Sequence, residues 1–482
     1  MSTHPLEEVL HPRSIAVVGA SGRPAGGSSF IDAVVDFGFQ GRIYPVNPKY
    51  SEIRDLKAYP SVKDIPGVVD YVISSIPAAK VLDMVADCAE KGVRAIHLYT
   101  ARFSETGRKD AAVLEQEILT QASAAGIRLI GPNCMGVYYP GGGISFRSDF
   151  PKESGSVGVV SQSGSAVMDI VGLGAMNGLR FSKAISYGNA LDFNEGDYLE
   201  YLTQDPDTKI ILMYIEGLRD GKRFFDILRR TTRTKPVIIV KGGRGESGTR
   251  ATASHTASLA GSMAVWETAV KQAGALSARH LEELTDVATA IHYLKPVLGK
   301  RVAVAGGAGG SSVLAADLCE EAGLDVIPLP QEIREELKAE GSEIWDWIGN
   351  PVDLSIRVDR DSTAGQFLKV MARNPNFDLL ITFVHTHGSG SGKKITADEF
   401  LASYSLDEVN NKPLLVTMEN DARGGTNNDQ PWLQEMLEEA KMKLLASNVP
   451  VYPSIERAAR AASKMIDYYR SKQKRGGTPN GA

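Results

Sequence analysis

Short apolar runs alternate with longer amphipathic stretches along most of this chain. The apolar runs are rich in Val and Ile, end in a turn of glycine or serine, and are followed by roughly ten to fifteen residues with helical spacing. This alternation predicts parallel β-strands connected by α-helices, the arrangement of an α/β protein.

At three places the alternation of strand and helix begins again with a glycine-rich turn between a strand and a helix. These turns lie in SIAVVGASG (14–22), GSVGVVSQSGSAV (155–167) and RVAVAGGAGGSSVLAADL (301–318). Each restart is typical of a new doubly wound sheet. We therefore predict three domains and a disordered tail, with the boundaries 1–145, 146–296, 297–470 and 471–482.

Composition and charge exclude several classes of protein. The 53 basic and 58 acidic residues leave a net charge of −5, which gives no basic surface for nucleic acid or an anionic membrane. Three cysteines do not form a disulfide framework, and no apolar run approaches the ~20 residues of a membrane span. The N-terminal residues lack the apolar core of a signal peptide, so we expect a cytoplasmic protein.

Turns at the ends of the first predicted strands could hold a ligand that carries phosphate. The N–H groups where SIAVVGA runs into SGRPAGGSSF could bind phosphate oxygens. The second strand ends in Asn47, Pro48 and Lys49, without the acid that an NAD protein places there. Lys49 suits a phosphorylated ribose, as in NADP or coenzyme A, although its position alone favours a solvated surface lysine. The turns in YVISSIPAAK (71–80) and LIGPNCMGV (129–137) could line the same cleft.

His255 stands within a segment of small residues, RATASHTASLAGS (250–262). Four glycines lie in 242–248, and no large apolar residue follows them before Leu259, which predicts a mobile loop. A largely neutral imidazole in such a loop could carry a phosphoryl group. From these residues alone, a histidine that caps the following helix is an equal alternative.

An ordered set of motifs, GPNCMG, GSVGVVSQSG, ILMYIEG and ASHTASLAG, resembles the α-subunit of NDP-forming acyl-CoA synthetases. This superfamily includes succinyl-CoA synthetase and the ADP-forming acetate-CoA ligases. The resemblance runs from His4 to Tyr468 and implies a Rossmann-like CoA-binding domain followed by two flavodoxin-like domains of succinyl-CoA-synthetase type. It implies a reversible ligase that converts acid, CoA and ATP to acyl-CoA, ADP and phosphate through an acyl phosphate and a phosphohistidine.

The resemblance also assigns residues to roles. His255 becomes the phosphoryl carrier, and Glu216, which ends the strand KIILMYIEG, orients its ring. Two helix N-termini bind the phosphoryl group; their residues are Ser161, Gln162, Ser163, Gly164 and Ser165 in one turn and Gly307, Ala308, Gly309, Gly310 and Ser311 in the other. The CoA-binding residues are Gly19, Ala20, Ser21, Gly22, Val46, Asn47, Lys49, Ile76, Pro77, Asn133 and Cys134.

No stretch resembles the ATP-grasp domains that bind nucleotide and Mg²⁺ in this superfamily, and no Walker A motif is present. We therefore expect a separate ATP-grasp β-subunit that binds ATP or ADP with Mg²⁺, in an α2β2 hetero-oligomer. The substrates are CoA, phosphate and a small carboxylic acid. A non-catalytic CoA-binding regulatory protein is the alternative, and an NADP oxidoreductase is disfavoured by the glycine pattern.

Two histidines, His385 and His387, stand close together in FVHTHGSGSGKK (383–394). Their spacing could serve a zinc ion, but no cysteine or acidic ligand is near in sequence. We expect them to contact the acyl group or to stabilise a turn, and we expect no metal site in this chain.

Overall fold

The computed structural model of the protein describes residues 4–21, 27–250, 262–339, 345–353, 364–384, 394–404, 406, 409, 412–418 and 431–476. The chain divides into two compact units, residues Met1–Leu284 and Thr285–Ala482. The first unit contains two large sheets, one parallel and one mostly parallel, and the second unit contains one parallel sheet.

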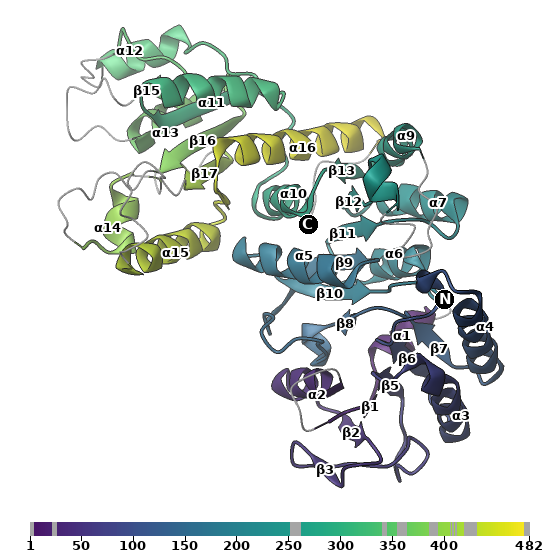
Figure 1. The fold of residues 1–482 in the computed structure, drawn as a ribbon. Helices are drawn as coiled ribbons and strands as arrows, with labels where there is room; N and C mark the ends of the chain where they lie inside the picture. The colour runs from purple at the N-terminus through teal and green to yellow at the C-terminus, as the bar shows by residue number, and fades with distance from the viewer. Residues whose placement is uncertain are drawn as a thin grey trace. The chain divides into compact units, whose positions relative to one another are not determined.

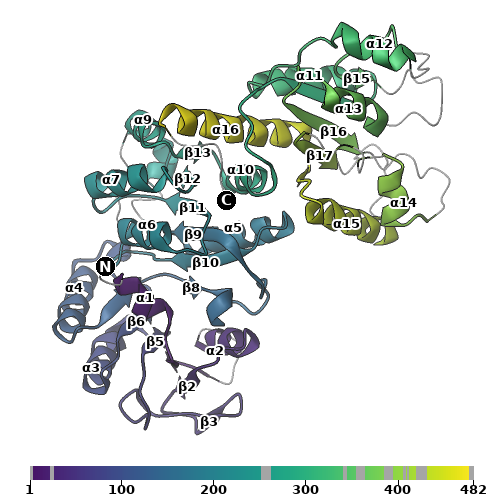
Figure 2. The same cartoon turned by 180° about the vertical axis from the view of Figure 1, so that it is seen from behind.

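The first sheet has the order β2-β1-β5-β6-β7, and all of its strands are parallel. Helix α2 packs on one face of this sheet, and α3 and α4 cover the other face (Figures 1 and 2). Strand β1 is buried at every position, which explains its uninterrupted apolar sequence. The elements are β1 (Ser14–Val18), β2 (Arg42–Val46), β5 (Tyr71–Ser74), β6 (Ala95–Leu98), β7 (Arg128–Ile130), α2 (Gly27–Asp36), α3 (Val81–Lys91) and α4 (Lys109–Ala124).

The second sheet has the order β13-β12-β11-β9-β10-β8. Its strands are parallel except β8, which pairs antiparallel with β10. Helix α5 packs on β9 and β10, while α6, α7 and α9 form a second layer (Figure 1). The elements are β8 (Gly136–Tyr138), β9 (Ser154–Ser161), β10 (Phe181–Ser186), β11 (Ile210–Ile215), β12 (Val237–Lys241), β13 (Leu276–Ala278), α5 (Gly164–Met176), α6 (Glu195–Gln204), α7 (Gly221–Thr231) and α9 (Met263–Ala273).

Shorter elements complete the first unit. The helix α1 precedes the first sheet and begins at the N-cap His4, whose ring accepts a hydrogen bond from the backbone N–H of Leu6. The remaining elements are α1 (Pro5–Leu10), β3 (Glu52–Ile53), β4 (Leu56–Lys57), η1 (Ala78–Lys80), η2 (Ser104–Thr106) and η3 (Pro140–Gly142).

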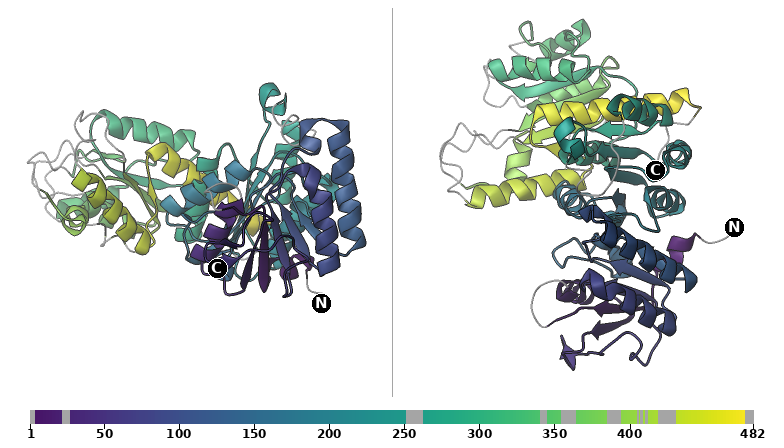
Figure 3. Two further views of the ribbon diagram at one scale, coloured as in Figure 1. Left: turned by 60° about the horizontal axis from the view of Figure 1, so that its bottom comes forward. Right: turned by 45° about the vertical axis from the view of Figure 1, so that its right-hand side comes forward.

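The second unit is built on a parallel sheet of order β15-β14-β16-β17-β18. Helices α11 and α16 pack against each other, and α13 packs on β14 and β16. Helix α16 is the long yellow helix in Figure 3. The division of the chain between Leu284 and Thr285 falls within α10 (Leu281–Tyr293). The other elements are β14 (Val302–Gly307), β15 (Val352–Asp353), β16 (Leu379–Val384), β17 (Leu414–Met418), β18 (Val451–Tyr452), α11 (Gly310–Glu321), α12 (Gln331–Ala339), α13 (Ala364–Arg373), α14 (Ala397–Ala402), α15 (Pro431–Ala446) and α16 (Ile455–Lys474).

The predicted α/β class with parallel sheets is confirmed. One strand belongs to a different sheet than its place in the sequence suggests: β8 lies within the predicted first domain but pairs with β10 of the second sheet. In the described residues, no helix combines the length and the apolar character needed to cross a membrane.

Candidate functional site

The turn after β1 lies against the turn after β5 at the carboxyl edge of the first sheet. Gly19 has φ +91°, and a Cβ at this position would lie 2.5 Å from the carbonyl oxygen of Ser75, so the close approach requires glycine. The Asn47 side chain, just after β2, donates a hydrogen bond to the carbonyl of Ala20 at 2.6 Å. Its oxygen accepts the N–H of the exposed Lys49 at 3.0 Å. Asn47 therefore holds two neighbouring strand ends together.

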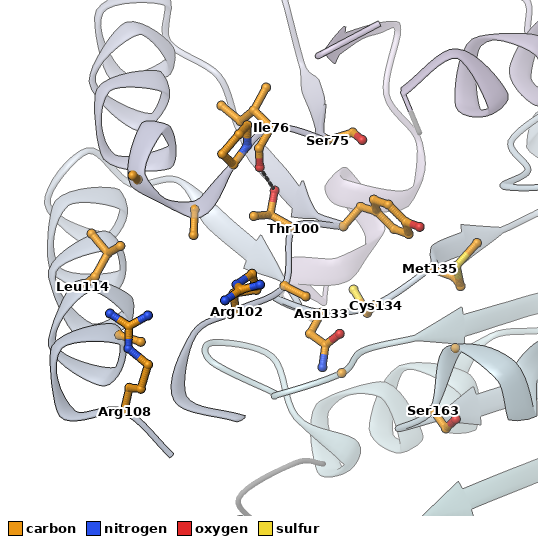
Figure 4. Close-up of a pocket in the computed structure, with 18 of the residues that line it drawn as sticks. Ser75, Ile76, Thr100, Arg102, Arg108, Leu114, Asn133, Cys134, Met135 and Ser163 are labelled. Atoms are coloured by element: carbon orange, nitrogen blue, oxygen red, sulfur yellow. Dashed lines mark hydrogen bonds between the residues drawn. The ribbon is translucent and has the colours of Figure 1, made fainter. Parts of the chain in front are cut away.

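A cavity of about 830 Å³ opens beside this edge (Figure 4). One wall comes from the ends of β5, β6 and β7, and the other comes from the turn between β9 and α5 and from the turn after β10. Part of the predicted CoA site and the first predicted phosphate site therefore open into one space. The predicted residues that line it are Ile76, Pro77, Asn133, Cys134, Gln162, Ser163, Gly164 and Ser165.

Other predicted residues lie outside the cavity lining. Gly19, Ala20, Ser21, Val46, Asn47 and Lys49 lie at or just after the ends of β1 and β2, while Ser161 ends β9 and Glu216 follows β11. Gly22 and His255 fall outside the described residues, as do His385 and His387.

Cys134 lies on the floor of the cavity and is buried. Burial raises the pKa of its thiol to about 12, so the thiol is neutral at physiological pH and is a poor nucleophile. Its carbonyl oxygen lies 3.1 Å from Nε2 of His97 on β6. Cys134 therefore packs as a small apolar residue at the cavity.

The turn between β9 and α5 presents the N-terminus of a thirteen-residue helix to the cavity. Ser163 is the N-cap, and its hydroxyl accepts the N–H of Ala166 at 3.3 Å. The same hydroxyl lies 3.0 Å from the Ser165 hydroxyl, and Ser161 donates a hydrogen bond to the carbonyl of Ser163 at 2.7 Å. Backbone N–H groups in the first turn of a helix attract anions, which fits the predicted phosphate site.

Glu216 is buried just after β11 and is connected to this turn. The side-chain oxygen of Gln162 accepts the backbone N–H groups of Glu216 and Gly217 at 2.8 and 3.0 Å. Lys241, at the end of β12, donates hydrogen bonds to the carbonyls of Glu216 and Gly242, both at 2.6 Å. Burial and the nearby Glu216 carboxylate raise the pKa of Tyr214 to about 12.

The third predicted turn lies in the second unit, between β14 and α11. Gly309 has φ +51°, and its N–H donates a hydrogen bond to the Asp353 carboxylate at 3.0 Å. The Ser311 hydroxyl accepts the N–H of Ala308 at 3.1 Å and donates to its carbonyl at 2.7 Å. This turn is therefore the N-terminus of a second helix, α11, and it belongs to the second unit.

Several residues that line the cavity were not singled out from the sequence. They are Tyr99, Thr100, Arg102, Arg108, Leu114 and Met135. Tyr99, Thr100 and Arg102 follow the apolar run that forms β6. Their position after a strand was the sequence feature that could have indicated a site at this edge of the sheet. Thr100 contributes directly to the site, because its hydroxyl donates a hydrogen bond to the carbonyl of Ile76 at 2.8 Å (Figure 4).

Comparison with known proteins identifies the family. Residues 13–140 match the CoA binding domain, and residues 154–291 match the succinyl-CoA ligase like flavodoxin domain. The α subunit of acetate-CoA ligase (ADP-forming) II from Pyrococcus furiosus is 36% identical over 464 residues, which cover 96% of this chain and 97% of that subunit. The chain belongs to the family of ADP-forming acetate-CoA ligase α subunits.

Two further relatives extend this result. The acetate-CoA ligase (ADP-forming) of Methanocaldococcus jannaschii is 37% identical over 336 residues, which are 69% of this ligase α subunit and 47% of that relative. The solved structure of dinucleotide-forming acetyl-coenzyme A synthetase 1 from Candidatus Korarchaeum cryptofilum, in complex with phosphate and ADP, has a TM-score of 0.78 at 30% identity and covers 98% of both chains. The predicted family and enzyme class, an ADP-forming CoA ligase, are confirmed.

Proposed function

We propose that this α subunit catalyses the reversible transfer of an acyl group between CoA and phosphate, and that it carries the phosphoryl group on His255 to a nucleotide held by a partner. The net reaction converts acid, CoA and ATP to acyl-CoA, ADP and phosphate. One observation carries the proposal. The ends of β5, β6 and β7 share a single cavity with the N-terminal turn of α5, so a thioester and a phosphate can meet there.

Coenzyme A would lie along the carboxyl edge of the first sheet. Its phosphates would contact the turn after β1 and Lys49, and its pantetheine arm would pass Ile76 and Pro77 toward Asn133. In open parallel sheets, ligands bind at this edge where the strand order changes direction, which here is between β1 and β5. The residue set is the one predicted from the sequence, with Gly22 outside the described part of the chain.

The acyl step needs phosphate beside the thioester. A phosphate oxygen attacks the thioester carbonyl, the C–S bond breaks, and the sulfur leaves as a thiolate that takes up a proton, which yields acyl phosphate and CoA. The N-terminal turn of α5, Gln162 to Ser165, would hold the phosphate through backbone N–H groups and serine hydroxyls. Because the Cys134 thiol is neutral, an acyl-cysteine intermediate is not part of this proposal.

The phosphoryl step would use His255. A ring nitrogen attacks phosphorus, the bond from phosphorus to the acyl oxygen breaks, and the free carboxylate leaves. Glu216 would accept a hydrogen bond from the second ring nitrogen and keep the first one unprotonated. The turn Gly307 to Ser311 would stabilise the phosphohistidine at a second position of the loop.

The nucleotide step would take place on an ATP-grasp β subunit in an α2β2 assembly. That subunit would bind ADP or ATP with Mg²⁺, which neutralises the charge of the nucleotide phosphates. Two matches support a separate partner. The chain covers 97% of a relative named as an α subunit, but only 47% of the M. jannaschii ligase.

The deciding experiment follows phosphate into the protein without any nucleotide. The chain is incubated with radiolabelled phosphate and a panel of acetyl-, isobutyryl-, phenylacetyl- and succinyl-CoA. We expect label in the protein that survives alkali and is lost in acid, as in a phosphoramidate. His255→Ala should abolish the label, whereas the matched variant Ser254→Ala should retain it.

Two outcomes would contradict the carrier role. Label that persists in the His255→Ala protein would put the phosphate on another side chain. A wild-type protein that binds CoA but takes up no label with any thioester would favour the regulatory CoA-binding protein instead.

A further inference from the structure

Arg102, just beyond β6, has an unusual backbone conformation. Its φ is +81°, in the left-handed region that glycine adopts freely and that side chains rarely adopt. Residues held in this region occur preferentially at functional sites, where the surrounding structure enforces the conformation. Arg102 also lines the cavity of the candidate site.

Glu105 enforces this conformation. Its carboxylate accepts the backbone N–H of Arg102 and, at 3.0 Å, the N–H of Phe103. The same carboxylate accepts the side-chain amide of Asn189 at 2.7 Å, which connects the loop to the turn after β10. Glu105 therefore ties the backbone of Arg102 to the turn after β10. The point from which the Arg102 side chain extends is thereby fixed at the cavity.

The guanidinium of Arg102 is exposed, and within the described part of the chain it forms no ion pair. A second cavity arginine, Arg108, provides a contrast, because its guanidinium binds the carboxylate of Asp110 through two nitrogens. Figure 4 shows Arg102 between Arg108 and Asn133. The cavity thus contains one arginine whose charge is matched by a carboxylate and one whose charge is available to a ligand.

The order of strands places Arg102 toward the acyl end of CoA, if CoA lies as proposed above. Neighbouring strands are ~4.8 Å apart, so the end of β6 lies roughly 10 Å from the end of β1 and roughly 14 Å from the end of β2. The CoA phosphates are assigned to β1 and β2. Arg102 instead neighbours Asn133 and faces the cavity that Ser163 also lines, where the acyl carbon must meet phosphate.

We propose that Arg102 selects acids that carry a second carboxylate at the end remote from the reacting one. The planar guanidinium can bind such a carboxylate through two parallel hydrogen bonds. The preferred substrate class would be short dicarboxylic acids, and Arg102 would bind the carboxylate that does not react. This proposal rests on the proposed CoA site, but it does not depend on the role of His255.

Calorimetric titration of the whole chain in phosphate-free buffer tests the proposal with two matched thioesters. Succinyl-CoA and butyryl-CoA differ only by a terminal carboxylate in place of a methyl group, and free CoA is the reference ligand. Arg102→Gly should weaken succinyl-CoA by roughly tenfold to a hundredfold and should change butyryl-CoA and CoA by less than about twofold. Because glycine adopts φ +81° freely, the variant should not unfold at a lower temperature than the wild type.

Arg147→Ala is the control, because Arg147 lies outside the cavity lining and pairs with Asp149; this variant should bind all three ligands like the wild type. Equal weakening of CoA and both thioesters by Arg102→Gly would assign Arg102 to CoA itself and overturn the proposal. Unchanged binding of succinyl-CoA would overturn it as well. A wild-type chain that binds no CoA would reject the underlying CoA site, whereas loss of phosphate labelling alone would reject only the carrier role of His255.

Discussion

At the scale of single residues, one buried ammonium group joins two parts of the proposed phosphoryl-transfer machinery. Lys241 ends β12, and its Nζ donates hydrogen bonds to the carbonyls of Glu216 and Gly242. Gly242 begins the glycine-rich segment that leads to His255. Burial lowers the pKa of Lys241, and the nearby Glu216 acts in the opposite direction. The ammonium therefore fixes the backbone of the proposed orienting residue.

We expect Lys241→Met to weaken both stability and phosphoryl transfer. Methionine fills a similar volume but cannot donate, so two carbonyls lose a charged donor, at a cost of about 1 to 3 kcal/mol in the free energy of unfolding. The displaced Glu216 should also slow labelling of the chain by at least about tenfold. Urea denaturation and the labelling assay measure the two effects.

Lys235 supplies a matched control, because it has the same chemistry at the other end of β12. Its Nζ donates to the carbonyls of Leu202 and Asp205, both at 2.6 Å, and burial lowers its pKa to about 8. Lys235→Met should lose stability but label at the wild-type rate. If both variants labelled equally slowly, the effect of Lys241→Met would reflect stability alone.

The sequence supports some of these residues better than others. Gln162 and Ser163 follow an apolar strand at a glycine-rich turn, and Asn133 lies in a family motif, so their presence at the cavity could be predicted. Lys241 and Arg102 could not. A lysine or arginine at or after the end of a strand has the pattern of a solvated surface residue. Only the packing of β11 and β12 shows that Lys241 is buried, and only the Glu105 carboxylate shows that the backbone of Arg102 is held at the cavity.

At the scale of elements, strand β6 supports the floor of the cavity through a fully buried histidine. Burial lowers the pKa of His97 to about 4, while its hydrogen bond to Cys134 acts in the opposite direction. A carbonyl can only accept, so Nε2 of His97 carries the proton in this contact. The neutral ring packs against Gly136, where a Cβ would collide with it. This packing leaves no space for solvent to stabilise an imidazolium.

We expect His97 to make the protein acid-sensitive between about pH 6.5 and pH 4. In this window the unfolded chain binds a proton that the folded chain excludes, so the free energy of unfolding falls as the pH falls. Below about pH 4 both states bind the proton and the loss levels off at about 3 kcal/mol. His97→Gln keeps an N–H donor but does not titrate. Denaturation curves of the two proteins should diverge in this window and run parallel from pH 7 to 8; parallel curves throughout would reject the assignment.

The prediction of elements succeeded where a strand, a turn and a helix followed each other. Strands β1, β9 and β14 lie at the three predicted restarts, and the helices α2, α5 and α11 follow them. Strand β8 was harder to assign, because three residues at the edge of a sheet carry no periodic pattern. Its pairing with β10 is set by tertiary packing, so sequence order alone places it with the wrong neighbours.

At the scale of the whole molecule, the described first unit combines the proposed thioester and phosphate sites in a single cavity. We therefore propose that acyl transfer between CoA and phosphate takes place in this unit. The glycine-rich turn of the second unit has its own N–H donors, but Asp353 already accepts one of them. Because two anions repel each other, a phosphohistidine that binds at this turn, as we propose, would have to displace the Asp353 carboxylate.

We expect the purified chain alone not to form acyl-CoA from ATP, and to gain this activity when an ATP-grasp β subunit from the same genome is added. Acyl phosphate should bypass the partner, because it enters the cycle after the nucleotide step: the chain alone should convert succinyl phosphate and CoA to succinyl-CoA and phosphate. The His255→Ala chain should retain this partial reaction, in which only the acyl group moves, but should fail in the complete reaction with the β subunit. Thioester absorbance and ADP release measure the two reactions separately. Robust ATP-dependent ligation by the isolated chain would show that it binds nucleotide itself, and loss of the partial reaction in His255→Ala would place the histidine in the acyl step.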